Sequence, residues 1–319
     1  MCRSVNDHAM VEGDSVKSNV IIPCLWLDDQ AEEAAKFYLG VFPGGRIVAT
    51  SHYPSSSDNP AGKPRGSVMT VEFEIAGQRF SALNGGPIFT INPSISFFYY
   101  AETAADVDRV YASLADGGQA LMPIGSYPWS ERYGWIKDRY GVSWQIMLAQ
   151  RGVPGNVIAT SLMFTGNIYG RAEEALKLYA QVFPDGHVEN VARYAAGEGP
   201  AANEGKVKYG RASVAGQGLV AMDSYGEHKF TFNEGLSLQV MCQNQAEVDH
   251  YWDRLGEGGE YGPCGWLKDR FGVSWQIVPT SMAEWMNIKD ELARDRAFQA
   301  MMGMTKLDIA TLEAAIHGK

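Results

Sequence analysis

GWIKDRYGVSWQI, residues 134–146, is the stretch of sequence from which the fold can be worked out. It recurs as GWLKDRFGVSWQI at residues 265–277, with eleven of the thirteen positions identical and two conservative exchanges. An identity of this length within one chain does not arise by chance. The sequence therefore predicts an internal duplication, with one such stretch in each copy.

Each copy of this stretch predicts a β-hairpin. Residues 138–141 (Asp-Arg-Tyr-Gly) have the composition of a turn, because the glycine can adopt a positive φ. In the strand that follows, successive side chains face opposite sides, so Ser143 and Gln145 lie on one face and the apolar side chains on the other. The polar face meets either solvent or a polar cavity, and the pattern alone leaves both alternatives open.

The segments before the hairpin predict two successive β-α-β-β-β units in each copy. Strands are recognised by apolar residues at alternate positions, and helices by apolar residues three or four positions apart. In copy one they are strand 20–27, helix 31–42, strands 46–53, 67–75 and 79–83, then strand 94–101, helix 104–114, strand 119–124, a loop at 125–133 and the hairpin.

Copy two follows at an offset of 141 residues in both helices and 131 residues in the final hairpin. It therefore lacks about ten residues, those around Tyr127-Pro128-Trp129-Ser130. Loops tolerate such changes and often carry function. We expect the two copies to have unequal cavities.

The duplication sets the predicted domain boundaries. Residues 1–18 are a polar tail, 19–150 form domain 1, 156–280 form domain 2, and 281–319 form a helical C-terminal tail. That tail has no counterpart in copy one. Its expected helices, at 282–300 and 306–315, are predicted to clamp the two domains together.

Composition excludes several functional classes. The net charge of −10, without a basic stripe, argues against a nucleic-acid partner. The four cysteines have no Cys-x-x-Cys spacing, which argues against a zinc ribbon, and so few cysteines suit a reducing compartment. No run of about 18 apolar residues and no apolar leader occur, so we expect a soluble, cytoplasmic protein without a membrane partner.

Three segments carry a family resemblance: residues 31–38 (AEEAAKFY), 80–87 (FSALNGGP) and 265–279 (GWLKDRFGVSWQIVP), together with the tail around 301–310. The chain resembles the vicinal oxygen chelate superfamily of glyoxalases, bleomycin resistance proteins and dioxygenases. Its PhnB-like branch, often labelled 3-demethylubiquinone methyltransferase-like, is the most similar. The resemblance implies an α+β fold with one cup-shaped mixed sheet per copy, paired as an intramolecular pseudo-dimer; further homodimerisation stays open.

In metal-using members, the resemblance implies His or Gln on the first strand, His on the fifth and Glu on the eighth as ligands. At the first-strand position this sequence has Pro23 and Cys24 in copy one and Thr160 and Ser161 in copy two. The fifth strand has Ser94 and Ser96 in copy one and Ser237 in copy two. The eighth strand has Gln145 in copy one and Gln276 in copy two. No acidic ligand remains, and a divalent cation needs charged or imidazole ligands. We therefore expect no metal and no other cofactor.

Other chemistry finds little support in the sequence. The only Gly-rich turn of methyltransferase type, Gly197-Glu198-Gly199, lacks a following helix, so the methyltransferase label is set aside. Cys24 and Cys242 lie in apolar strands and are expected to be inert, whereas Cys264 lies in a loop and is the more reactive candidate. The Lys-Asp-Arg of each hairpin is either a turn ion pair or an anion site.

The candidate ligand-binding residues are polar or aromatic side chains expected to face the cups. Trp129 is predicted to be a lid, Asn84 and Asp223 to orient a ligand at the end of the fourth strand, and His52 to lie near a strand end. The full set is Trp26, His52, Asn84, Ser96, Trp129, Gln145, Asp223, Ser237 and Gln276.

Three functions follow from these expectations. The first is a metal-free protein that binds a small aromatic or apolar molecule. The second is an enzyme of the same superfamily, a lyase, isomerase or dioxygenase with or without a metal, whose catalytic residues the sequence does not reveal. The third is a structural protein whose cups are filled by its own side chains.

Overall fold

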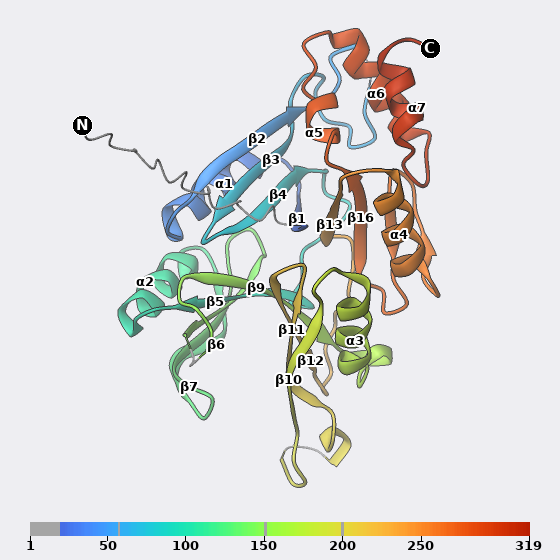
Figure 1. Ribbon diagram of the computed structural model, residues 1–319. Coiled ribbons are helices and arrows are strands. Elements are labelled where there is room, and N and C mark those ends of the chain that lie inside the picture. Colours follow the sequence, from blue (N-terminus) through green and yellow to red (C-terminus); the bar gives the residue numbers. More distant parts are fainter. Residues whose placement is uncertain (1–19, 57, 150–151, 199–200) are drawn as a thin grey trace, which may run out of the picture.

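The computed structural model, shown in Figure 1, describes residues 20–319 except 57, 150–151 and 199–200. The tail expected over residues 1–18 lies outside the described residues. Copy one contains β1 (Ile21–Leu27), α1 (Ala31–Val41), β2 (Arg46–His52), β3 (Val68–Ile75), β4 (Gln78–Asn84), β5 (Ile95–Ala101), α2 (Ala104–Ala115), β6 (Gln119–Tyr127), β7 (Ser130–Lys137) and β8 (Ser143–Leu148).

Copy two repeats this order, which confirms the predicted duplication of the β-α-β-β-β unit. It contains β9 (Val157–Phe164), α3 (Ala172–Val182), β10 (His187–Arg193), β11 (Val207–Val214), β12 (Gln217–Asp223), β13 (Leu236–Cys242), α4 (Gln245–Gly256), β14 (Glu260–Tyr261), β15 (Trp266–Lys268) and β16 (Ser274–Pro279). The tail adds α5 (Met282–Trp285), α6 (Glu291–Met302) and α7 (Ile309–Ile316).

Two expected segments were wrong in detail. The loop predicted at 125–133 is a hairpin, because β6 runs to Tyr127 and β7 begins at Ser130; three register shifts absorb the prolines and glycine that hid the strand pattern. The helix predicted over 282–300 is two helices, since Asp290 caps a new one by accepting hydrogen bonds from the backbone N–H groups of Leu292 and Ala293.

The strands form two eight-stranded mixed sheets, and each sheet contains one unit from each copy. Sheet A has the order β14-β15-β16-β13-β1-β4-β3-β2, and sheet B the order β10-β11-β12-β9-β5-β8-β7-β6. The two halves of each sheet meet at an antiparallel pair, β1 with β13 and β5 with β9. The expectation of one sheet per copy is therefore wrong: pairing across copies covers the inner edges that each unit would otherwise expose.

One continuous hydrophobic core joins the helix-facing sides of both sheets. Helices α1 and α4 pack on sheet A, and α2 and α3 pack on sheet B. In Figure 1, sheet A lies above sheet B, with α1 and α2 on one side and α3 and α4 on the other. We call the opposite side of each sheet its bowl face.

The aspartate of the repeated hairpin locks the two sheets together. Asp138, the residue after the β7 strand of sheet B, accepts a 2.7 Å hydrogen bond from the hydroxyl of Tyr38 on helix α1, which packs on sheet A. It also accepts from the indole of Trp144 at 2.9 Å and from the backbone N–H groups of Tyr140 and Val142. The turn that aims these groups needs Gly141, whose φ is 85°.

Copy two has the equivalent contacts, but there the aspartate belongs to sheet A and the tyrosine to the helix on sheet B. Asp269, next to β15 of sheet A, accepts from Tyr179 on α3 of sheet B at 2.6 Å and from the indole of Trp275 at 2.9 Å. Both aspartates are buried. The repeated stretch is thus the joint between the sheets, and its aspartate forms neither the turn ion pair nor the anion site considered from sequence.

The C-terminal helices pack beside sheet A and contact both copies. Asp295 of α6 accepts a hydrogen bond from Ser56 in the β2–β3 loop of copy one. The backbone carbonyls of Met304 and Thr305 accept 2.7 Å hydrogen bonds from Cys264 and Gly265 of copy two. Figure 1 shows these helices against the β2–β3 loop and next to β13 and β16.

Candidate ligand-binding site

A row of neutral polar side chains crosses the centre of the bowl face of sheet A. Cys24 on β1 lies opposite Ser81 of β4 and Ser237 of β13. Gln276 of β16 donates a 2.9 Å hydrogen bond from Nε2 to Ser237 Oγ, and its Oε1 accepts one from Gln239 at 3.2 Å. The row therefore combines strands of both copies.

This row does not fit a divalent cation. Burial raises the pKa of the Cys24 thiol to about 11, an effect that the neighbouring Gln276, Ser81 and Ser237 side chains only partly offset. At neutral pH the side chains of the row carry no negative charge, and Gln276 already uses both ends of its amide. The carboxylate of Glu72, which lies opposite Ser81 on β3, is held in an ion pair with Arg79. No group of three or more His, Cys, Asp or Glu side chains converges anywhere in the described ranges.

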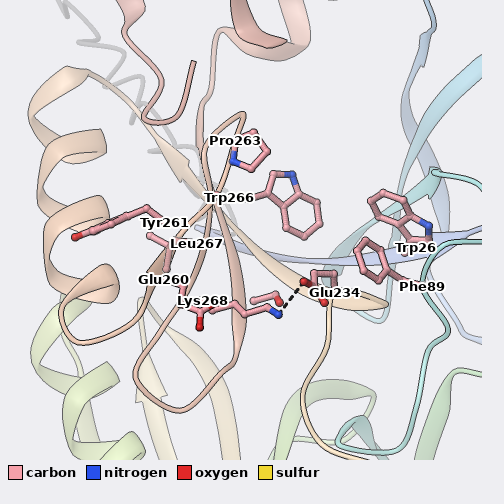
Figure 2. A pocket seen from close by; sticks show the side chains of 11 residues that line it. Trp26, Phe89, Glu234, Glu260, Tyr261, Pro263, Trp266, Leu267 and Lys268 are labelled. Atoms are coloured by element: carbon pink, nitrogen blue, oxygen red, sulfur yellow. Dashed lines mark ion pairs between the residues drawn. The ribbon is translucent and has the colours of Figure 1, made fainter. Parts of the chain in front are cut away.

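An aromatic cleft of about 310 Å³ opens at one end of the same bowl face. Trp26 forms an edge-to-face contact with Phe89, with ring centroids 4.9 Å apart, and another with Trp266 at 6.1 Å. Lys268 and Glu234 form an ion pair of 2.8 Å across it (Figure 2). The full lining is Trp26, Phe89, Glu234, Glu260, Tyr261, Gly262, Pro263, Trp266, Leu267, Lys268 and Ser274.

Strand alternation places the side chains of the cleft. Leu25 and Leu27 belong to the helix-facing core, so Trp26 between them faces the bowl. Leu267 also belongs to that core, which turns Trp266 and Lys268 to the bowl. Tyr261 pairs with Leu267 and stacks its ring on Trp252 of α4, so this ring points away from the cleft, as Figure 2 shows.

One buried hydroxyl in the cleft wall is left unpaired. Ser274 is 1% exposed, and its Oγ has no hydrogen-bond partner among the residues the structure describes. In copy one the equivalent Ser143 accepts a 2.6 Å hydrogen bond from the indole of Trp135. An unpaired buried hydroxyl costs free energy unless a partner reaches it, and Ser274 belongs to the lining of the cleft, so it is a candidate polar contact there.

The bowl face of sheet B is occupied by its own side chains. Phe98 and Tyr100 stack there with centroids 5.7 Å apart, and the hydroxyls of Tyr100 and Tyr209 are 3.0 Å apart. Tyr133 donates a 2.7 Å hydrogen bond to Gln145 Oε1, whose Nε2 donates to Ser96 Oγ at 3.0 Å. The polar pair Ser96 and Gln145 is therefore buried under aromatic rings rather than in contact with solvent.

Two predicted site residues lie on the helix-facing side instead of in a bowl. Asn84 accepts a hydrogen bond from Ala31 N at the start of α1, and its amide donates to Val68 O. Asp223 accepts from Gly170 N, Ala172 N and Val207 N around the start of α3. Their polar atoms fix helices to strands, so neither side chain is directed at a cavity.

The remaining predicted site residues divide between the two sheets. Trp26, Ser237 and Gln276 share the bowl face of sheet A, whereas Ser96 and Gln145 share that of sheet B. His52 is exposed at the end of β2, away from the cleft lining. Trp129 lies at the tip of the β6–β7 hairpin, 44% exposed, with its ring stacked on Tyr127 at 5.1 Å. It lines an open hollow of about 500 Å³ beside sheet B, together with Tyr127 and Leu148.

Sequence reasoning missed Phe89, Glu234, Lys268 and Ser274 as cleft residues. A signal for one of them was present: copy one has Asn92-Pro93-Ser94 where copy two has Asn233-Glu234-Gly235. Cys264, the thiol favoured from sequence, is half-buried beside Met302, and burial raises its pKa, which does not favour a nucleophilic thiolate.

The fold, two eight-stranded mixed sheets built from duplicated β-α-β-β-β units, is of the same structural class as that of glyoxalase I. The family model described as 3-demethylubiquinone-9 3-methyltransferase matches residues 19–147 and again residues 156–278. The chain therefore belongs to this PhnB-like family. The family description names an activity, whereas the match itself establishes membership.

Two solved structures are similar to this chain. A PhnB protein from Bacillus cereus is 39% identical over 40% of this chain and 98% of its own, with a TM-score of 0.37. Glyoxalase I from Zea mays is 12% identical over 82% of this chain and 91% of its own, with a TM-score of 0.52, a likeness of fold alone. A search among curated proteins gave no match.

Among the described residues, no helix combines the length and the apolar character that a bilayer-crossing helix requires.

Proposed function

We propose that this protein binds a small organic molecule in the bowl of sheet A without the help of a metal ion. The observation that carries the proposal is the aromatic cleft with the unpaired hydroxyl of Ser274 in its wall. Binding sites for small molecules are concave and mostly apolar, with a few polar groups that fix orientation. The aromatic cleft has this composition.

The chemistry of the polar row supports binding rather than catalysis. Its side chains are hydroxyls, amides and a thiol whose pKa is raised, and none of these is a general base at neutral pH. They can hydrogen-bond a ligand that extends from the aromatic cleft toward the centre of the bowl. The same donor set supports metal-independent binding, because it lacks the anionic ligands that hold a divalent cation.

The proposal assigns one working bowl to the chain. Sheet B covers its own polar pair with Phe98, Tyr100, Tyr133 and Met147, all buried, so the third function considered from sequence, a cup filled by side chains, suits that sheet. The two sheets then have separate tasks, sheet A in binding and sheet B in structure.

A thermal-shift screen in the presence of a chelator tests the proposal. We expect members of a broad panel of small molecules to raise the melting temperature of the wild-type protein in EDTA. Trp266→Leu should abolish that shift because it removes a wall of the cleft. Trp135→Leu is the matched control, since it alters the equivalent tryptophan of copy one, and it should retain the ligand-induced shift.

Two results would defeat the binding function itself, and a third would contradict its location. One is a panel that leaves the melting temperature unchanged. The other is a ligand-induced shift that requires an added divalent ion and disappears in EDTA, which would favour a metal-dependent enzyme of the same superfamily. Equal loss of the shift in both tryptophan variants would place the site outside the cleft.

A further inference from the structure

We propose that the aromatic cleft selects a compact organic cation, such as an alkylated ammonium group; this assignment rests on the binding function proposed above and specifies its ligand. The internal duplication provides the argument, because sheet B has the same positions in the same register. Comparing the two shows what sheet A has acquired.

Three residues that line the cleft of sheet A differ from their equivalents in sheet B, and each difference adds an aromatic ring or a carboxylate to the cleft. Trp26 pairs with Leu83 where the equivalent Met163 pairs with Met222. Glu260 pairs with Lys268 where Gln119 pairs with Lys137. Sheet A thus has an additional aromatic ring and an additional carboxylate.

The third difference is Glu234, which replaces Pro93. The register of this segment is fixed by two equivalent turns, in which Asn233 accepts from Gly235 N and Asn92 accepts from Ser94 N. Together with Glu260, Glu234 supplies two carboxylates to the cleft of sheet A against the single ammonium of Lys268. The equivalent positions of sheet B hold a lysine and no carboxylate.

The walls have the chemistry that cation binding requires. The faces of Trp26, Trp266 and Phe89 carry the negative side of the ring quadrupole, and such faces attract an ammonium ion most strongly where water is excluded. Edge-to-face packing of Trp26 with each of the other two rings sets these faces at large angles, 81° and 70°, around the corner of the cleft.

The polar groups complete a site for such a ligand. Glu234 lies between Lys268 and the aromatic rings, as Figure 2 shows, so its carboxylate can face a bound cation while it still pairs with the lysine. The buried Ser274 hydroxyl, which has no partner within the described part of the chain, offers a hydrogen bond to a polar substituent. A small ammonium compound with a hydroxyl group satisfies both features.

Isothermal titration with a matched pair of probes tests the charge preference. Choline and 3,3-dimethylbutan-1-ol have the same shape, but the first has a quaternary nitrogen where the second has a neutral carbon. We expect choline to bind the wild-type protein at least about tenfold more tightly than the neutral probe, because only the cation gains from the ring faces and Glu234.

Two substitutions with opposite effects sharpen the test. Glu234→Gln removes a negative charge and should weaken choline binding about fivefold to tenfold, whereas Lys268→Met removes the opposing positive charge and should strengthen it by a similar factor. Glu291→Gln is the control for Glu234→Gln. It changes the net charge by the same amount, but Glu291 is an exposed side chain of α6 outside the cleft. Unchanged melting temperatures establish that each variant is folded.

The outcomes separate this inference from the proposed function. Equal binding of the two probes, or binding that Glu234→Gln strengthens and Lys268→Met weakens, overturns the cation assignment and leaves a site for a neutral or anionic molecule. If the thermal-shift panel identifies neutral ligands whose stabilising effect is lost in Trp266→Leu, and choline does not bind, the proposed binding function is retained and the assignment of a cationic ligand is wrong. If no compound binds, both fail.

Discussion

At the scale of single residues, the aspartates of the repeated hairpin have the largest structural role. Asp138 and Asp269 each accept four hydrogen bonds, two from side chains and two from backbone N–H groups. Every one of the four partners is a donor. A buried carboxylate is the one side chain that can satisfy all of them, which explains why both copies contain it.

Asp138→Asn should therefore destabilise the protein by roughly 2–4 kcal/mol. The asparagine keeps the size but replaces one acceptor oxygen by a donor, so at least one of the four donors loses its partner, and each buried group left unpaired costs about 1–3 kcal/mol. Urea denaturation followed by circular dichroism measures the change in the free energy of unfolding.

Asp116→Asn is the control for that substitution. Asp116 is exposed and pairs with Arg139 at the surface, where an ion pair contributes about 0–1 kcal/mol. If Asp138→Asn lowers the free energy of unfolding no more than Asp116→Asn does, the role of Asp138 as the joint between the sheets is contradicted.

The thiol of Cys24 gives a second prediction at the scale of residues. Because its pKa is raised to about 11, the thiol stays protonated at neutral pH and becomes a thiolate only as the pH approaches that value. Iodoacetamide labelling, read by peptide mass spectrometry, should leave Cys24 almost unmodified at pH 8 and should accelerate above about pH 10.

Two controls accompany the labelling experiment. Circular dichroism at each pH shows that the protein stays folded, and labelling of the less buried Cys264 shows that the reagent is active. Rapid modification of Cys24 at pH 7 would reveal an activated nucleophile and would favour an enzyme over a binding protein.

At the scale of elements, the C-terminal helices hold one wall of the aromatic cleft. The segment that follows α6 forms two 2.7 Å backbone hydrogen bonds with Cys264 and Gly265, the residues between Pro263 and Trp266 of the cleft. Leu307, which is 1% exposed, anchors this segment in the apolar cluster of the tail. The tail thus contributes to the shape of the site without lining it.

Leu307→Ala should loosen that wall. Removing a buried leucine leaves a cavity and costs about 2–5 kcal/mol, which here is expected to release the segment from residues 262–266. Hydrogen-exchange mass spectrometry should show faster exchange in these residues, together with weaker ligand binding, while sheet B stays protected. Leu292→Ala, at an exposed position of α6, should change neither; faster exchange in both variants would refute the anchoring role.

Sequence patterns predicted most of the elements but fewer of the site residues. Each copy's helices and most strands have clear apolar periodicity, and the repeated hairpin fixed the duplication. The β6–β7 hairpin was hidden because prolines and glycine interrupt its alternation. Asn84 and Asp223 were assigned to a cavity because a strand pattern does not reveal that a polar side chain caps a helix.

At the scale of the whole molecule, the sheets depend on both copies. The sequence shows where a unit begins and ends, but the partner of β1 is decided by contacts more than 200 residues along the chain, such as Ile21 with Val240. This exchange puts the polar row and the aromatic cleft between the copies: Trp26 comes from copy one and Trp266 from copy two. Neither copy alone contains the site.

Separate expression of the copies tests this dependence. Residues 19–150 or 156–319 alone leave the inner edges of β1 and β5, or of β9 and β13, unpaired, so each half should self-associate or aggregate. Mixing the two halves should give a one-to-one complex that regains ligand binding, as measured by light scattering coupled to size-exclusion chromatography. A stable, folded monomer of either half would contradict the dependence of each sheet on strands from both copies.

We propose that the row formed by Cys24, Ser81, Ser237 and Gln276 serves a ligand and not a metal ion. The most direct measurement is the metal content of protein purified without chelator, determined by plasma mass spectrometry. We expect far less than one divalent ion per chain. A stoichiometric, tightly held zinc, iron, manganese or nickel ion that is lost in Gln276→Ala would contradict it.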